Sequence, residues 1–148
     1  MKRIAELRDL SDDHHTALVL ARRCLRARPG DDSAIASAWA AVRAAFDVEL
    51  EPHFRIEEQY LLPALEEIGE SELAERVRSD HALLRGLVAA GAADAGHVER
   101  FGHLLDAHVR FEEREVFELA QTRLSPTALA AIAAACSQWR RARAKGGG

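Results

Sequence analysis

The chain has 148 residues, a length that suits one domain with a single sizeable core. Apolar residues make up 48% of it, charged residues 30%, and the formal net charge is −4. This balance argues against nucleic-acid and membrane-surface partners, and no stretch approaches the ~20 apolar residues of a membrane span. The N-terminus lacks the apolar segment of a signal peptide, so a cytoplasmic protein is expected.

The first half of the chain predicts two long helices. Abundant alanine, leucine, glutamate and arginine favour helix, and apolar spacing predicts the first over about residues 2–27. The second is predicted over about residues 32–68, with Asp31, Asp32 or Ser33 as its N-cap and Gly69 as its end. Pro52 lacks a backbone donor, which predicts a kink or local irregularity just before His53.

Three more helices are predicted over about residues 71–90, 94–123 and 127–145, the last with Ser125 as N-cap and Pro126 at its first position. Short connections make successive helices antiparallel neighbours. The expected fold is all-α: an antiparallel up-down-up-down four-helix bundle (residues 2–123) with an additional C-terminal helix (residues 126–145). We expect a single domain of residues 1–145, followed by a disordered tail of residues 146–148.

Two cysteines, Cys24 and Cys136, lie far apart on apolar helical stretches. One disulfide between them is the alternative, but two buried thiols in a cytosolic protein are the favoured interpretation.

Each of the four bundle helices places one histidine on its apolar stripe: His14, His53, His81 and His108. His15 lies about 100° round the helix from His14 and stays open as the alternative on the first helix. His103 lies five residues before His108, about 140° away, which favours a solvated side chain.

The hexad H-x-R-x-E-E occurs twice, at residues 53–58 and 108–113. It places Glu57 and Glu112 one turn after a histidine, on the same helix face, with Cβ atoms about 6 Å apart. Asp-His pairs at residues 13–14 and 80–81 repeat in the same way, so the chain consists of two similar helical hairpins. Buried imidazoles and carboxylates need partners. A pair of metal ions would provide them, and nitrogen and oxygen ligands suit iron, zinc or manganese.

The remaining acidic residues of these motifs allow two interpretations. Glu58 and Glu113 lie about 100° from the paired glutamates, which favours solvated side chains or pairs with Arg55, Arg110 or neighbouring arginines. A hydrogen bond to a metal-bound imidazole is the alternative. The same choice holds for the aspartates at residues 13 and 80, which equally fit charges at a helix start.

The ordered pattern H…H-x-x-x-E…H…H-x-x-x-E over about residues 1–123 resembles the hemerythrin-like family, in particular the bacterial HHE cation-binding domains. This resemblance implies a four-helix bundle around a non-haem di-iron centre. It implies six metal ligands: His14, His53, Glu57, His81, His108 and Glu112. Glu57 and Glu112 would bridge two iron ions together with an oxo or hydroxo group, and zinc or manganese are possible substitutes.

Two departures bear on the expected function. Oxygen-carrying hemerythrins have a second histidine where this chain has Arg85, and an aspartate at +5 where it has Glu112 at +4. One fewer histidine leaves more open metal positions, so we expect binding or reduction of dioxygen, peroxide or nitric oxide rather than stable oxygen carriage. No general acid stands out, and enzyme status stays open. The alternative is an iron- or oxygen-sensing or metal-storage module that acts through a protein partner, with the helix around Trp139 as a partner or homodimer surface.

Overall fold

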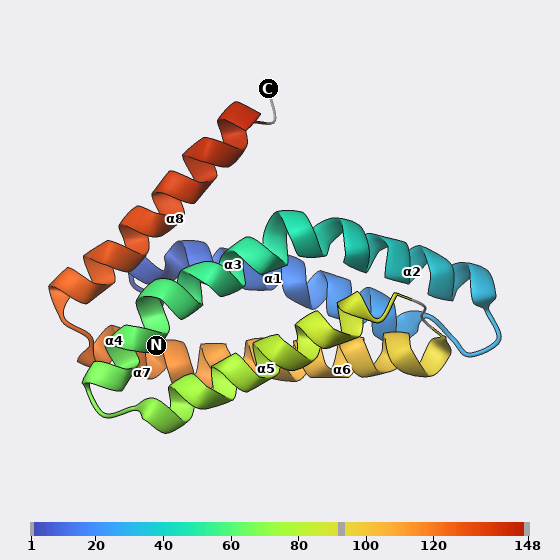
Figure 1. The fold of residues 1–148 in the computed structure, drawn as a ribbon, viewed down its shortest axis with the longest axis horizontal. Helices are drawn as coiled ribbons and strands as arrows, with labels where there is room; N and C mark the ends of the chain where they lie inside the picture. Colours follow the sequence, from blue (N-terminus) through green and yellow to red (C-terminus); the bar gives the residue numbers. More distant parts are fainter. Residues whose placement is uncertain (1, 92–93, 147–148) are drawn as a thin grey trace.

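The structure is a computed structural model that describes residues 2–91 and 94–146. Every regular element within these ranges is a helix, and they contain no strand (Figure 1). The all-helical prediction is therefore confirmed for the described residues. None of the helices in these ranges combines the length and the apolar character that crossing a lipid bilayer requires.

The first helix, α1, spans Ala5–Arg26. The second predicted helix is one continuous arm of five elements: α2 (Asp32–Ala45), η1 (Phe46–Leu50), α3 (Glu51–Ile56), η2 (Glu57–Leu61) and α4 (Leu62–Glu67). Asp31 caps α2, because its carboxylate accepts a hydrogen bond from the Ala34 amide at 3.0 Å. Gly69, at φ 88°, follows the arm in the left-handed conformation that commonly ends helices.

The elements η1, η2 and η3 (Glu112–Val116) are π-helical turns, in which the hydrogen bonds reach one residue further than in an α-helix. Pro52 and Pro63 each follow a π turn by two residues, where a proline cannot donate the regular bond. The predicted irregularity before His53 is thus confirmed. The turn η3 has no proline beside it and was not predicted. Both η2 and η3 begin at a candidate metal ligand, which fits the frequent occurrence of π turns at functional sites.

The other elements are α5 (Ser71–Ala89), α6 (Ala95–Phe111), α7 (Phe117–Arg123) and α8 (Pro126–Gly146). With η3 between them, α6 and α7 form one continuous arm. The N-cap prediction for α8 is confirmed, because the Ser125 hydroxyl accepts a hydrogen bond from the Ala128 amide at 3.1 Å. Gly146, expected in the tail, is the last residue of α8, whereas residues 147–148 lie outside the described ranges.

Two apolar clusters fill the bundle. The first apolar cluster includes Leu20, Trp39, Phe54, Leu84 and Phe101, and the second includes Leu10, Leu61, Val77, Phe117 and Ile132. The four arms are α1, α2 to α4, α5, and α6 to α7. Along the chain, α1 runs from the second apolar cluster to the first, and the next arm runs from the first to the second. The third and fourth arms repeat this order. On every arm, the candidate metal ligands lie between the two clusters or at their border. The bundle core therefore consists of two apolar parts separated by a polar layer.

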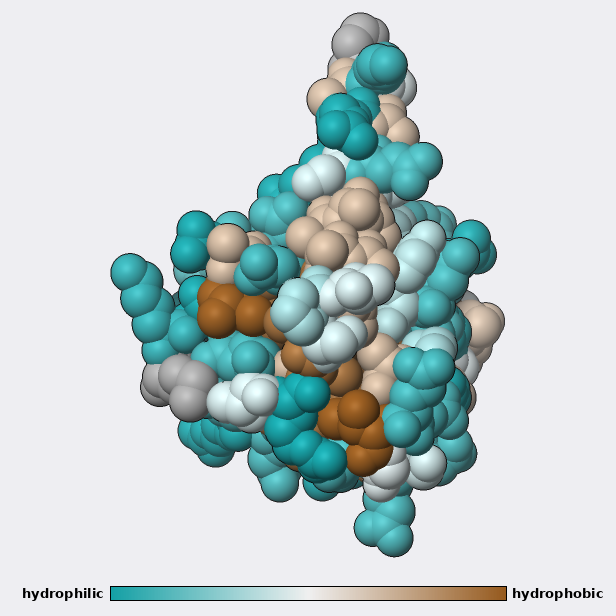
Figure 2. All heavy atoms as spheres, turned by 90° about the vertical axis from the view of Figure 1, so that its left-hand side faces the viewer, coloured by the Kyte–Doolittle hydropathy of each residue, from teal (hydrophilic) through white to brown (hydrophobic). Residues whose placement is uncertain are grey.

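The last helix, α8, packs against α1, α3 and η2. Ile132 and Cys136 are buried there in the second apolar cluster. Beyond residue 139 the helix is exposed, and its C-terminal end projects away from the bundle (Figure 1). This projecting end is mostly hydrophilic in Figure 2. The prediction of two buried thiols is confirmed, since Cys24 and Cys136 are both buried and free.

Candidate metal centre

The polar layer contains six buried side chains: His14, His53, Glu57, His81, His108 and Glu112. They are the buried polar or charged residues of the described ranges, and they are the six candidate ligands predicted from the sequence. Each of the four arms contributes at least one of them. Such burial is costly unless the groups find partners of opposite charge or a metal ion.

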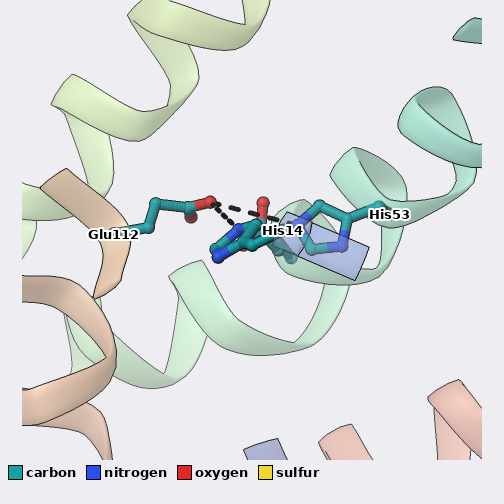
Figure 3. Close-up of side chains that lie close together, drawn as sticks. His14, His53 and Glu112 are labelled. Carbon is teal, nitrogen blue, oxygen red and sulfur yellow. Dashed lines mark hydrogen bonds and ion pairs between the residues drawn. The ribbon is translucent and has the colours of Figure 1, made fainter. Parts of the chain in front are cut away.

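The first group consists of His14, His53, Glu57 and Glu112, and one ligand atom from each lies within 4.8 Å of the others. The Nε2 atom of His14 lies 3.0 Å from Oε1 of Glu112. The Nε2 atom of His53 lies 3.3 Å from Oε2 of Glu57 and 4.0 Å from Oε1 of Glu112. Figure 3 shows the Glu112 carboxylate pointing toward the two imidazole rings.

The second group consists of Glu57, His81, His108 and Glu112, again with one ligand atom from each within 4.8 Å of the others. The Nε2 atom of His81 lies 3.2 Å from Oε1 of Glu57, and that of His108 lies 3.1 Å from Oε1 of Glu112. Glu57 and Glu112 therefore belong to both groups. This arrangement is suited to two neighbouring cations that share two carboxylates.

All four imidazoles bind a further carboxylate through Nδ1. His14 pairs with Glu113 at 2.7 Å and His81 with Glu58 at 2.6 Å. His53 pairs with Asp13 and His108 with Asp80, both at 3.0 Å. We call these four carboxylates the outer acceptors. The outer acceptors follow the twofold repeat of the sequence. The histidine of each Asp-His pair binds the second glutamate of a hexad, and the histidine of each hexad binds the aspartate of an Asp-His pair.

The favoured sequence interpretation of the outer acceptors was right in part: Glu58 pairs with Arg85 and Glu113 with Arg3, but the imidazole contacts are those of the alternative. Arg55 pairs with Glu51, and Arg110 pairs with Asp106, so neither arginine takes Glu58 or Glu113. The two aspartates lie inside α1 and α5 rather than at a helix start. These carboxylates, about 100° from the core stripe of their helices, are partly buried and face a neighbouring helix. The repeated Asp-His and Glu-Glu pairs were the signal for this role.

An acceptor at Nδ1 fixes the imidazole tautomer and leaves Nε2 free to bind a metal. The Nε2 atoms of His53, His81 and His108 are buried and have no hydrogen-bond partner. Both carboxylate oxygens of Glu57 and Oε2 of Glu112 are likewise unpartnered. Buried polar atoms without partners are rare in native proteins. The donor set therefore fits metal cations at the centre of the layer.

The electrostatics of the layer depend on the paired charges. Burial lowers the pKa of each imidazole, but the neighbouring carboxylates outweigh it and raise the pKa of His14, His53 and His81. For His108 the same balance, with the charge of Glu112 as the main raising cause, gives a pKa of about 10. Burial raises the pKa of Glu112, yet the charge of the nearby His108 and the hydrogen bond from His14 hold it well below its usual range. Without metal, protons thus supply the positive charge that the carboxylates require.

Aromatic rings and a small cavity surround the layer. Phe54 stacks on His81 with ring centroids 3.9 Å apart, and Phe117 stacks on His14 at 5.0 Å. A cavity of about 10 Å³ reaches three of the histidines and is otherwise lined mainly by apolar side chains: Ala17, Leu50, Phe54, Leu105 and Val109. That volume holds about one water-sized molecule.

The other histidines lie outside both groups. His15 is exposed, which resolves the alternative on the first helix in favour of His14 as the inward residue. His103 is 67% exposed, as predicted, and lies 3.5 Å from Glu99. The Nε2–H group of His97 donates to the Leu87 carbonyl at 2.7 Å, and its ring contacts Trp39 edge-on.

Fold and site together define a helical-bundle protein with two adjoining groups of histidine and glutamate suited to metal cations. The Hemerythrin family model, described as a hemerythrin HHE cation binding domain, matches residues 5–120. The chain therefore belongs to the hemerythrin HHE cation-binding family. The matched range includes all six candidate ligands and ends before α8. No curated protein and no solved structure matches the chain significantly.

Proposed function

We propose that the protein binds two iron ions and uses them to bind or reduce a small oxidant: dioxygen, peroxide or nitric oxide. The observation that carries this proposal is the sharing of two buried carboxylates by two groups, each of which contains two histidines of its own. The six proposed ligands are those of the polar layer, with Glu57 and Glu112 as the bridging pair.

The donor chemistry supports iron. Each group offers two imidazoles with carboxylates and no thiolate, a set typical of non-haem iron sites with open positions, which zinc or manganese can also occupy. Bound iron would supply Lewis acidity and redox electrons. The chain itself fixes the four imidazoles through the outer acceptors and excludes bulk water with buried apolar side chains.

The size of the cavity supports a small ligand. Its volume of about 10 Å³ admits a water-sized molecule beside His14, His53 and His108, but no organic substrate. Apart from Asp13 and the three histidines, its walls are Leu50, Leu105 and other apolar groups, which favour an uncharged diatomic molecule over an ion.

The finer architecture is part of the same proposal. The alternating order in which the arms meet the two apolar clusters supports an antiparallel up-down-up-down arrangement in a single domain. In that arrangement each hairpin contributes two histidines and one bridging carboxylate. The two halves of the repeated sequence then form one centre.

Elemental analysis of protein purified from iron-supplemented cells tests the metal content. We expect close to two iron ions per chain, and fewer than about one metal ion would refute the di-metal proposal. The visible spectrum of the reduced protein, exposed in turn to dioxygen, peroxide and nitric oxide, then identifies the ligand. A stable and reversible dioxygen band would instead indicate oxygen carriage.

The second candidate function is metal sensing or storage through a partner. The observation that favours it is the position of α8, which lies outside the matched family range. This helix nevertheless contacts the edge of the polar layer, since Arg140 lies 3.4 Å from the outer acceptor Asp13. The exposed end of α8 beyond Trp139 would then meet the partner or a second copy. Analytical ultracentrifugation with and without metal separates the two functions, since assembly that depends on metal favours sensing.

A further inference from the structure

Arg85, one turn after His81 on α5, makes the densest set of polar contacts beside the metal centre. Its Nε and Nη2 groups donate to both carboxylate oxygens of Glu51, at 2.9 and 2.8 Å for the shortest pairs. Its Nη1 and Nη2 groups donate to the two carboxylate oxygens of Glu58, at 2.7 and 3.1 Å. The guanidinium thus joins two carboxylates of the second arm, and such paired contacts fix geometry as well as charge.

The contact with Glu58 leads directly to a candidate ligand. Oε2 of Glu58 accepts hydrogen bonds from Nη1 of Arg85 and from Nδ1 of His81, the latter at 2.6 Å. This is the shortest of the four imidazole–carboxylate contacts around the centre. The position of this oxygen therefore determines where the His81 ring lies and which nitrogen has the proton.

A second contact connects Arg85 to the same ring. The guanidinium carbon lies 5.6 Å from the centroid of Phe54, and Phe54 stacks on His81 at 3.9 Å with an interplanar angle of 14°. Arg85 therefore touches both neighbours of His81, its hydrogen-bond acceptor and its stacking partner.

The other outer acceptors differ in this respect. A single Nη atom of Arg3 donates to the Glu113 backbone carbonyl at 3.0 Å and to its carboxylate at 3.2 Å. Arg140 lies 3.4 Å from one carboxylate oxygen of Asp13. Within residues 2–91 and 94–146, no arginine contacts Asp80. Among these arginines, Arg85 is thus the one whose guanidinium donates hydrogen bonds to both carboxylate oxygens of an outer acceptor.

We propose that Arg85 is a positioning residue for His81: by holding Glu58 and Phe54, it keeps the Nε2 atom of His81 directed at the metal of the second group. This inference rests on the proposed two-metal function and adds a residue outside the ligand set to it. Loss of an outer partner of a metal ligand typically weakens metal binding 10–100-fold. Arg85 acts on His81 through such a partner, Glu58, so we expect its loss to have an effect up to the lower end of that range.

The test compares Arg85→Gln with Arg55→Gln. Arg55 also pairs with Glu51, at 3.3 Å, but has no contact with Glu58, so the control removes the same charge from the same carboxylate. Both variants and the parent are loaded with iron, and release to a chelator is followed over time. We expect Arg85→Gln to release one of its two ions faster than the parent, by up to about tenfold, whereas Arg55→Gln releases both at the parent rates.

Arg85→Lys provides the second variant, because it keeps the charge but not the planar, paired contact. We expect it to fold like the parent and to release one ion at an intermediate rate. Parent-like release from folded Arg85→Gln would overturn the proposal. Equal acceleration of both ions, or the same change in Arg55→Gln, would show a general structural effect and would also overturn it.

A readout in the metal-free protein keeps this inference separate from the proposed function. The Nδ1–H proton of His81, assigned by its absence in His81→Gln, is expected in the NMR spectrum of the parent and of Arg55→Gln. It should exchange with water and disappear in Arg85→Gln. If the parent binds fewer than one metal ion per chain, the proposed function fails. The imidazole signal still decides the role of Arg85, and an unchanged signal in Arg85→Gln refutes it.

Discussion

Among single residues, Glu57 and Glu112 differ from the four histidines because each belongs to both groups of candidate ligands. Each histidine belongs to one group, and its Nδ1 atom is hydrogen-bonded to its own outer acceptor. The carboxylates have unpartnered oxygens that face the centre of the layer. The loss of a shared carboxylate should therefore affect both metal ions.

Replacing Glu112 by alanine tests this difference. We expect the metal content to fall from about two ions to fewer than one per chain, whereas His53→Ala should retain about one. The matched control is Glu115→Ala, which removes an exposed carboxylate from the same π turn and should leave two ions. Elemental analysis of the three purified variants measures the result, and a Glu112→Ala protein that still holds two ions would contradict the assigned ligands.

The raised imidazole pKa values predict a pH dependence. A histidine binds metal only after losing its proton, and the pKa of His108 in the metal-free centre is about 10. At neutral pH metal binding must therefore release protons, and the apparent metal affinity should rise with pH. Competition with a chelator between pH 6 and pH 8 measures this dependence. An affinity that is constant over that range would contradict protonated imidazoles in the metal-free centre.

The burial of the six candidate ligands could be predicted from the sequence because the helical patterns that indicate it are local. His53 and Glu57 share a helix face through the i, i+4 rule, and the same holds for the second hexad. The role of Glu58 could not be predicted in this way. Its partner His81 is 23 residues away on another arm, so the contact depends on how two arms pack. The hydrogen bond from Arg85 to Glu58 also joins two arms, so it could not be predicted from local spacing either.

At the scale of the helices, the boundaries of the arms were predictable from caps and breakers, whereas their internal geometry was only partly so. Pro52 predicted an irregularity in the second arm. No residue type predicts η3, which begins at Glu112 and has no proline beside it. In this turn the helix widens where the buried Glu112 carboxylate contacts three histidine rings. The packing of the polar layer, rather than local sequence preference, is the physical reason that remains for this turn.

The docking of α8 gives a prediction at the same scale. Ile132 is fully buried in the second apolar cluster, so Ile132→Ala should lower the free energy of unfolding by about 2–5 kcal/mol. The control Ser137→Ala changes an exposed position of the same helix and should alter stability by less than about 0.5 kcal/mol. Urea unfolding of both variants measures the difference. Equal stability of the two would indicate that α8 is not docked as described.

For the whole molecule, the main feature is a charged layer between two apolar clusters. The apolar clusters alone can hold the arms together, but the layer contains unpartnered polar atoms that a metal would satisfy. A ligand that binds only the folded state stabilises it in proportion to the logarithm of its concentration over Kd. Metal should thus add stability to a bundle that is already helical.

Removal of metal with a chelator tests this expectation. The far-UV circular dichroism of the metal-free protein should remain helical, while its Tm falls by several degrees relative to the metal-loaded protein. Glu112→Ala serves as the control, because its Tm should respond little to added metal. A metal-free protein that loses its helical signal would show that the apolar clusters do not suffice for folding.

The π turns also have a consequence for the lengths of related chains. Deleting one residue from a regular α-helix rotates every later side chain by about 100°, which would turn core residues outward. A π turn contains one residue more than the α-helical register needs, so a deletion there restores the regular helix and leaves both flanks facing as before. Homologues whose arms are one residue shorter are therefore expected to have their alignment gaps at residues 46–50, 57–61 or 112–116.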